Sequence, residues 1–167
     1  LFFITLKDFF TKKFKNLSIN LGHFGFSLLI LSILFNNIFS SEIITNLRVG
    51  ETFKSEKFEI NFENIEQKQE KNYRAIIGKF NVKNFNDRLE ILRPELRIYN
   101  QPNIVTSEAD IKTDLLADRF MTMNLVQNQE YFNIRYQVKP FMIWIWLSVI
   151  LISSAGLISL FKKRYEN

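Results

Sequence analysis

The amino-acid sequence predicts an α+β membrane protein in which two transmembrane helices flank a small, mostly antiparallel β domain. Three observations predict this fold class. Two apolar runs of membrane length lie at residues 17–39 and 140–161. Between them, residues 40–139 change to the two-residue apolar alternation that is typical of half-buried strands. The excess of basic residues lies outside both apolar runs.

The charge distribution predicts the orientation of the helices. Residues 41–139 contain 15 Lys plus Arg and 15 Asp plus Glu, so the net charge of +5 comes entirely from the ends of the chain. Cationic flanks mark the cytoplasmic side of a membrane protein. We therefore expect a cytoplasmic basic segment at 1–16, an extracytoplasmic domain at 40–139 and a cytoplasmic basic tail at 162–167. The basic character then reflects membrane orientation and indicates no nucleic-acid partner.

The first apolar run has 23 residues, which at about 1.5 Å per residue cover a hydrocarbon core of about 30 Å. Its glycines and serines suit close approach to other helices. A cleaved signal peptide is the alternative interpretation. The run is longer than a typical signal core, and Phe39-Ser40-Ser41 is a poor cleavage site. We therefore favour an anchored helix.

The second apolar run is expected to begin with Pro140 in its first turn, where a missing N–H group costs little. Trp144 and Trp146 are placed near the outer boundary, since amphipathic indoles favour the headgroup level. The last strand leads into this run almost without a linker, so we expect the β domain to lie close to the membrane. Basic residues follow the run on the inner side; they are Lys162, Lys163 and Arg164.

In the central region, alternation predicts strands around residues 58–63, 76–82, 96–99, 121–125 and 132–138. Charged loops are expected at 66–72 and 84–88. The stretch Ser107-Glu108-Ala109-Asp110 is expected to cap a short helix that extends to Leu116.

His23 is the only histidine and lies inside the first apolar run. An ionisable group at membrane depth is a functional hypothesis, because an unpaired polar group there is costly. Neutral imidazole is a preferred axial ligand of haem iron, and Gly22 and Gly25 are expected to leave room for a planar macrocycle or a neighbouring backbone. The alternative is that His23 only hydrogen-bonds a polar group on another helix. The run alone leaves both interpretations open, and a second haem ligand would have to come from outside this chain.

Other candidate residues are weaker. Arg93, Arg97 and Arg119 could pair with carboxylates or haem propionates, although exposed strand positions explain them as well. A group of acidic residues is expected to form a solvated face or to supply charges at a helix start; it consists of Glu108, Asp110, Asp114 and Asp118. The sequence has no cysteine, which excludes disulfides, thiolate metal sites and a cysteine nucleophile in this chain. It also has no phosphate-binding loop or nucleophile elbow, so its motifs do not indicate a soluble enzyme.

Several motifs follow one another in a fairly specific order. They are Asn72-Tyr73-Arg74-Ala75, Gly78-Lys79-Phe80, Tyr99, Thr106-Ser107-Glu108-Ala109, Leu115-Leu116-Ala117-Asp118, and Lys139-Pro140-Phe141 with Trp144 and Trp146. A helix with Leu21-Gly22-His23-Phe24-Gly25 precedes them. Together these motifs resemble the C-terminal part of the CcmF family, the haem-lyase subunits of the bacterial and mitochondrial cytochrome c maturation system. The resemblance covers nearly the whole chain, from about residue 17 to 165.

The resemblance implies a large multi-pass membrane protein that receives haem from a chaperone and promotes its thioether attachment to apocytochrome c. It implies that His23 is one of two intramembrane histidines that hold a permanent haem b, as an axial ligand of the haem iron. The family's tryptophan-rich haem-handling segment, its extracytoplasmic histidine pair and the other haem b ligand have no match here. Because the sequence also begins with Leu1 and not Met, we expect a fragment or a split-gene product that is not catalytic alone.

The resemblance further implies partners and a location. The partners are the upstream half of the protein or a split subunit, the haem chaperone, the subunits that deliver apocytochrome c, apocytochrome c itself and membrane lipid. The location is the bacterial inner membrane with the β domain in the periplasm, or the mitochondrial inner membrane. The alternative function is a membrane-tethered structural or sensory β domain without a cofactor, which fits the composition and topology equally well.

Overall fold

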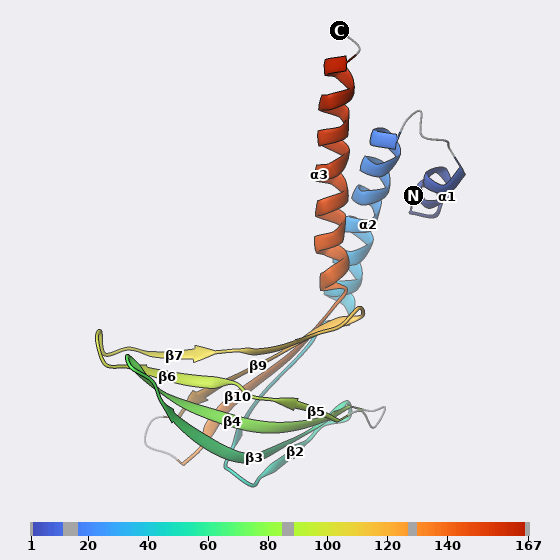
Figure 1. Cartoon of the computed structure of the whole chain (residues 1–167). Coiled ribbons are helices and arrows are strands. Elements are labelled where there is room, and N and C mark those ends of the chain that lie inside the picture. Colours follow the sequence, from blue (N-terminus) through green and yellow to red (C-terminus); the bar gives the residue numbers. More distant parts are fainter. Residues whose placement is uncertain (1, 12–16, 85–88, 127–129, 166–167) are drawn as a thin grey trace. The chain divides into compact units, whose positions relative to one another are not determined.

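The structure is a computed structural model that describes residues 2–11, 17–84, 89–126 and 130–165. The chain divides into two compact units (Figure 1). The helical unit comprises Leu1–Ser40, Asp114–Asp118 and Lys139–Asn167, and the β unit comprises Ser41–Thr113 and Arg119–Val138.

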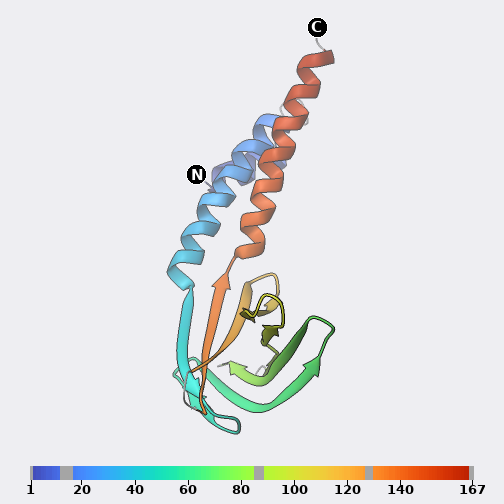
Figure 2. The same ribbon diagram turned by 90° about the vertical axis from the view of Figure 1, so that its left-hand side faces the viewer.

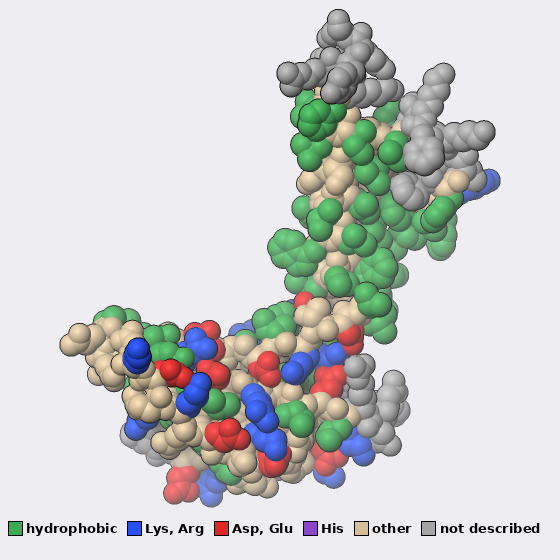
Figure 3. Space-filling model, in the orientation of Figure 1, with side chains coloured by type: hydrophobic (Ala, Val, Ile, Leu, Met, Phe, Trp, Pro, Cys, Tyr) green, Lys and Arg blue, Asp and Glu red, His purple; other side chains and the backbone are tan. Residues whose placement is uncertain are grey.

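The helical unit contains α1 (Phe2–Thr11), α2 (Leu17–Phe39) and α3 (Met142–Tyr165). α2 and α3 lie side by side in both ribbon views (Figures 1 and 2) and are long and apolar enough to cross a membrane. Hydrophobic side chains cover the visible surface of these two helices, whereas charged side chains gather on the β unit (Figure 3). α1 was not expected, because the segment 1–16 was interpreted only as a basic flank.

The start of α3 differs from the prediction. Pro140 is the last residue of strand β10 (Phe132–Pro140), and α3 begins two residues later at Met142. Between them, Phe141 adopts a left-handed backbone conformation with φ of 61°. The Pro140 carbonyl accepts a hydrogen bond of 2.6 Å from Asn36 Nδ2 on α2. Strand and helix are therefore joined by a single residue, as the missing linker predicts.

The β unit consists of two sheets. In one sheet the order is β1-β10-β9-β8, with β1 (Ser41–Leu47), β9 (Ala117–Leu125) and β8 (Asp110–Thr113). In the other sheet the order is β2-β3-β4-β6-β7, and β5 also pairs with β4. The strands of this second sheet are β2 (Thr52–Lys54), β3 (Phe58–Gln69), β4 (Tyr73–Asn84), β5 (Leu89–Leu92), β6 (Glu95–Tyr99) and β7 (Val105–Glu108). The pairs β1–β10, β2–β3, β3–β4, β4–β5, β4–β6 and β6–β7 are antiparallel.

The two sheets share one hydrophobic core. Alternate residues of the strands are buried, as the period of two predicts, and Phe62 and Phe80 stack with ring centroids 4.2 Å apart. The core residues are Leu47, Ile60, Phe62, Phe80, Val82, Leu92, Leu96, Met121, Met123, Ile134 and Tyr136. The prediction of a small, mostly antiparallel β domain flanked by two apolar helices is therefore confirmed.

The short helix expected from Ser107 to Leu116 is wrong. This stretch forms β7 and β8, because Glu95–Ile98 on β6 pair in register with Val105–Glu108. The Asp110 side chain, which was expected to help start the helix, instead accepts a hydrogen bond of 2.7 Å from the backbone N–H of Arg93. Pairing between strands has here overridden a local capping preference.

The charged loops also differ in part. β3 extends to Gln69 and pairs with β4 up to Arg74, so the loop expected at 66–72 shrinks to its last residues. The extra residues carry polar side chains on both faces, which removes the alternation that predicts a strand. Of the loop expected at 84–88, Asn84 ends β4, and residues 85–88 lie outside the described residues.

A buried ion pair lies among these strands. Arg119 Nε lies 2.6 Å from Glu90 Oε2, and each side chain is only 9% exposed. Tyr136 is buried nearby; burial and, secondarily, the Glu90 carboxylate raise the pKa of its hydroxyl, while Arg119 opposes this. Among the three arginines singled out from the sequence, Arg119 is therefore a buried charge and not an exposed strand residue.

We predict that Glu90→Gln lowers the stability of the β unit by about 3–5 kcal/mol, because it leaves the Arg119 guanidinium buried without its charged partner. The double variant Glu90→Leu plus Arg119→Met is expected to recover most of this loss, since it removes both charges together. Hydrogen exchange of the β9 and β10 amides, in the full chain in detergent, measures both the loss of stability and its recovery. Equal exchange rates in Glu90→Gln and the parent protein would contradict the prediction.

Candidate functional site

His23 lies on an exposed apolar face of α2. Its neighbours one turn away are Ile19, which is 58% exposed, and Phe26, which is 55% exposed. Ile30 and Ile33 continue the same face toward the C-terminal end of the helix, at the three- and four-residue spacing of one helical face. His23 is thus an imidazole set into an otherwise apolar stripe, which we call the His23 face.

The opposite side of α2 is packed against α3. A Cβ atom on Gly25 would lie 3.0 Å from Ile152 Cγ1 and 3.2 Å from the backbone nitrogen of Ile152, and one on Gly22 would lie 3.6 Å from Ala155 Cβ. Ser18 Oγ donates a hydrogen bond of 2.8 Å to the Ala155 carbonyl. The two glycines therefore allow close approach of α3, so of the two expected occupants, a macrocycle or a neighbouring backbone, the structure has the neighbouring backbone.

A third side of α2 contacts α1. The hydroxyl oxygens of Thr5 and Ser27 lie 2.7 Å apart, and the rings of Phe2 and Phe24 have centroids 5.8 Å apart. α3 thus contacts α2 on the side opposite the His23 face, whereas α1 contacts it at the edge of that face, because Ser27 lies one turn from His23. The face that carries the only histidine is the one that no described helix covers.

The bonding environment of His23 fits a role as a single donor. Within the described part of the chain, His23 has no hydrogen-bond or ion-pair partner. The same residues contain no group of three or more His, Cys, Asp or Glu side chains that is placed to hold a metal ion. An imidazole without an internal partner can donate a nitrogen lone pair to one axial position of haem iron. A haem held in this way would need a second axial donor from elsewhere.

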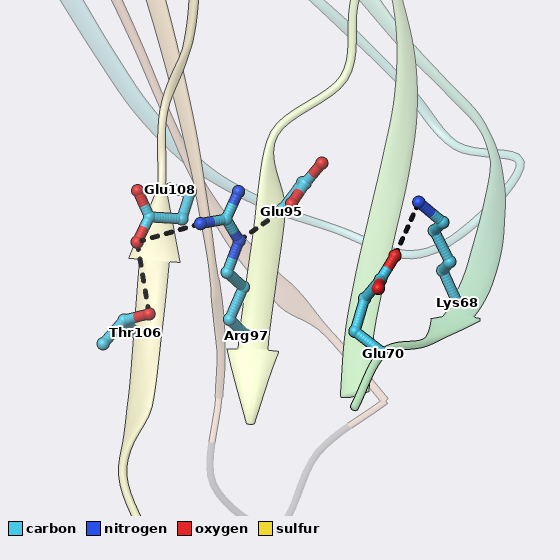
Figure 4. A network of polar contacts seen from close by, with 6 residues as sticks. All are labelled: Lys68, Glu70, Glu95, Arg97, Thr106 and Glu108. Carbon is cyan, nitrogen blue, oxygen red and sulfur yellow. Dashed lines mark hydrogen bonds and ion pairs between the residues drawn. The ribbon is translucent and has the colours of Figure 1, made fainter. Parts of the chain in front are cut away.

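Two of the three arginines expected to meet anionic groups, Arg97 and Arg119, have carboxylate partners inside the β unit. Arg97 Nε lies 3.0 Å from Glu95 Oε2, and its NH1 atom lies 4.0 Å from Glu108 Oε1 (Figure 4). Its guanidinium also lies 5.3 Å from the centre of the Tyr73 ring. The hydrogen bond to Glu95 raises the pKa of Arg97. Arg97 is thus engaged in a surface network, and Arg93 contributes its backbone N–H to Asp110.

The acidic residues do not form one site. Glu108 contacts Arg97 and accepts a hydrogen bond from Thr106 (Figure 4), and Asp110 accepts one from the backbone of Arg93. Asp114 Oδ1 accepts hydrogen bonds of 2.8 and 2.9 Å from the backbone N–H groups of Leu116 and Ala117. These three carboxylates thus hold strands and a turn in place, whereas Asp118 Oδ1 is buried without a hydrogen-bond partner among the described residues.

One contact was not foreseen from the sequence. The Trp144 indole Nε1 donates a hydrogen bond of 2.8 Å to the Leu115 carbonyl, while Trp146 is 64% exposed. The two tryptophans, interpreted together as boundary residues, therefore differ: only Trp144 is tied to a loop. The motif Leu115-Leu116-Ala117-Asp118 was noted only as part of a resemblance, and nothing in its pattern predicts a partner on α3.

Comparison with known proteins assigns the chain to a family. Residues 38–140 match the family model described as the CcmF C-terminal beta-sandwich. The chain belongs to the CcmF family. A solved structure of the cytochrome c haem lyase CcmF has the same fold over 93% of this chain, with a TM-score of 0.69 and 16% sequence identity, and the match covers 27% of that structure's chain.

Curated CcmF-family relatives are similar over most of this chain. The cytochrome c-type biogenesis proteins CcmF of Pseudomonas aeruginosa and Escherichia coli are 23% and 24% identical over 87% of it, and in each case 22% of the relative is covered. The protein ccl1 of Rhodobacter capsulatus is 29% identical over 75% of it, and 19% of that relative is covered. The chain thus spans about a fifth of these relatives and is a CcmF-type cytochrome c biogenesis component.

We predict that cysteines placed by Gly22→Cys and Ala155→Cys form a disulfide between α2 and α3, because a Cβ–Cβ distance of 3.6 Å suits that bond. The chain has no other cysteine, so the product is unambiguous. Adding Gly25→Val is expected to reduce the yield strongly, since its side chain would press on the Ile152 backbone. Adding Gly156→Val is the matched control, because nothing lies within 4 Å of a Cβ there. Equal loss from both valines would refute close packing at Gly25.

Proposed function

We propose that this chain is the C-terminal portion of a membrane haem-handling assembly factor for cytochrome c maturation, in which His23 provides one axial ligand to a haem b within the membrane. Membership of the CcmF family supports the biological process. The observation that carries the ligand role is the position of His23, alone among apolar side chains on the uncovered face of α2. An apolar surface that presents one imidazole is what a haem group with one ligand from this helix requires.

The proposal places α2 and α3 across the membrane. Both helices pass the length and composition test for a span, and the basic residues of the sequence outside them favour cytoplasmic ends. The β unit would then face the extracytoplasmic side, which is the periplasm in a bacterium or the intermembrane side in a mitochondrion.

The chain's own residues have separate parts in this proposal. His23 would hold the iron through one ring nitrogen, while Ile19 and Phe26 would present an apolar surface to the macrocycle and exclude water. Haem bound there would supply one-electron redox chemistry. α3, packed on the opposite side through Gly22 and Gly25, would fix the rotation of α2 and hence the direction of the imidazole.

The proposal also assigns partners. The upstream half of the protein, or a split subunit, would cover the His23 face and provide the second axial ligand. The haem chaperone, the subunits that deliver apocytochrome c, and apocytochrome c itself would meet the assembled protein, with the β unit as a support or docking domain. By itself the chain would not attach haem.

We predict that the full chain, co-purified with its upstream portion, shows a reduced b-type visible spectrum that His23→Ala abolishes. Ile33→Leu is the matched control, because it alters the same exposed face without removing a ligand, and it is expected to retain the haem. His23→Gly with added imidazole is expected to restore part of the spectrum, since free imidazole can replace the axial ligand.

A folding defect is separated from loss of a ligand by the disulfide between positions 22 and 155. His23→Ala is expected to leave its yield unchanged, because His23 faces away from α3. If the spectrum survives His23→Ala, or if the intact complex contains no haem although the disulfide forms, the ligand role is refuted. A membrane-tethered β domain without a cofactor is then the better description.

A further inference from the structure

The loop between β8 and β9 presents two adjacent leucines to the outside. Leu115 is 67% exposed and Leu116 is 68% exposed, among the most exposed large apolar side chains of the described residues. This loop belongs to the helical unit, as Asp114–Asp118, although it connects two strands. We call Leu115 and Leu116 the leucine tip.

The backbone of the leucine tip is satisfied largely from within the protein. The Asp114 carboxylate accepts hydrogen bonds from the N–H groups of Leu116 and Ala117, and the Asp114 N–H donates to the Ala117 carbonyl at 3.1 Å. A loop in water does not need these internal hydrogen bonds, because water can pair with its backbone N–H and carbonyl groups. A loop that enters an apolar medium does need it, because each unsatisfied group there is costly.

Both carbonyls of the leucine tip accept hydrogen bonds from the start of α3, one from the preceding residue Phe141 and one from Trp144 in the first turn. The Phe141 N–H donates to the Leu116 carbonyl at 2.8 Å, and Trp144 Nε1 donates to the Leu115 carbonyl, also at 2.8 Å. These bonds hold the tip at the level of the Trp144 indole. An indole at the end of an apolar helix is typical of the membrane interface. On α3, Ile143 and Trp146 add exposed apolar side chains at the same end of the helix.

We propose that the leucine tip inserts into the interfacial region of the lipid bilayer, next to the point where α3 enters it. This inference rests on the proposed membrane placement of α2 and α3. The tip is a third membrane contact of the chain, in addition to the two spans. Because it is hydrogen-bonded to the start of α3, it fixes the depth of that helix end, and lipid covers the leucines that water would otherwise contact.

The hydrogen bonds of the leucine tip favour lipid over a protein partner as the occupant. A protein interface commonly satisfies exposed backbone groups across the contact, whereas both tip carbonyls already have internal donors. The exposed remainder consists of aliphatic side chains with no hydrogen-bonding demand, which suits acyl chains and glycerol backbones. The tip also lies beside the part of α3 that faces lipid in the proposed membrane placement.

The absence of cysteine from the sequence allows a direct test. Leu116→Cys is labelled with the fluorophore NBD, and the full chain is reconstituted in vesicles of phosphatidylcholine and phosphatidylglycerol. Quenching by doxyl-labelled lipid is compared with quenching by aqueous iodide. Leu89→Cys is the matched control in the β unit, because Leu89 is also an exposed leucine, at 61%. Ile30→Cys, on the exposed side of α2, reports whether the span is in the bilayer.

The expected result is a blue-shifted emission at position 116, quenched several-fold more strongly by doxyl lipid than the label at position 89. If the label at 116 behaves like that at 89 while the label at 30 senses lipid, the tip proposal is wrong and the membrane placement stands. If neither quencher reaches position 116, protein covers the tip and the lipid proposal is also wrong. If iodide quenches all three labels, both the tip proposal and the proposed membrane placement are wrong.

Discussion

The close contact between α2 and α3 is the constraint on which the candidate site depends. At Gly25 the backbones approach so closely that an added Cβ atom would lie 3.2 Å from the Ile152 nitrogen. Between two apolar helices in lipid, burial of apolar surface gives little driving force, so packing of small residues and hydrogen bonds decide which faces meet. Ser18 adds such a bond to the Ala155 carbonyl. With one side of α2 fixed in this way, the rotation of the helix is set, and His23 is placed on the far side.

The direct connection between β10 and α3 is a second constraint on the structure. A single residue, Phe141, links β10 to α3, and its positive φ of 61° is unfavourable for a side chain of this size. The surroundings offset that cost. The Phe141 N–H donates to the Leu116 carbonyl, and its ring lies 5.2 Å from that of Phe35 on α2. The Asn36 side chain meanwhile satisfies the preceding carbonyl of Pro140. The start of α3 is thus defined by contacts within the helical unit and not by a helix cap of its own.

The sequence predicts those features that follow from periodicity and hydropathy. The apolar runs yield the two long helices, and the alternation around Phe62, Phe80 and Tyr136 yields β3, β4 and β10, because these patterns report directly on burial. The stretch 107–116 was predicted wrongly, since the partner of β7 is β6 and no local pattern encodes that pairing. The polar end of β3 was missed for a related reason: strands exposed on both faces lose their alternation. The direction of His23 also depends on a distant partner, α3, which spacing alone does not reveal.

The contacts made by each side of α2 bear on the proposed function. One side is occupied by α3 through Gly22 and Gly25, and another contacts α1 through Ser27 and Phe24. The remaining side carries a polar imidazole among isoleucine and phenylalanine side chains. In a membrane, an imidazole that no group contacts is costly, so the proposed topology requires a donor, an acceptor or a metal opposite it. Within the described residues His23 has no hydrogen-bond partner, so the proposal places that group on another segment. The proposed haem iron, with its second ligand from the upstream portion, meets this requirement with the single histidine that this chain has.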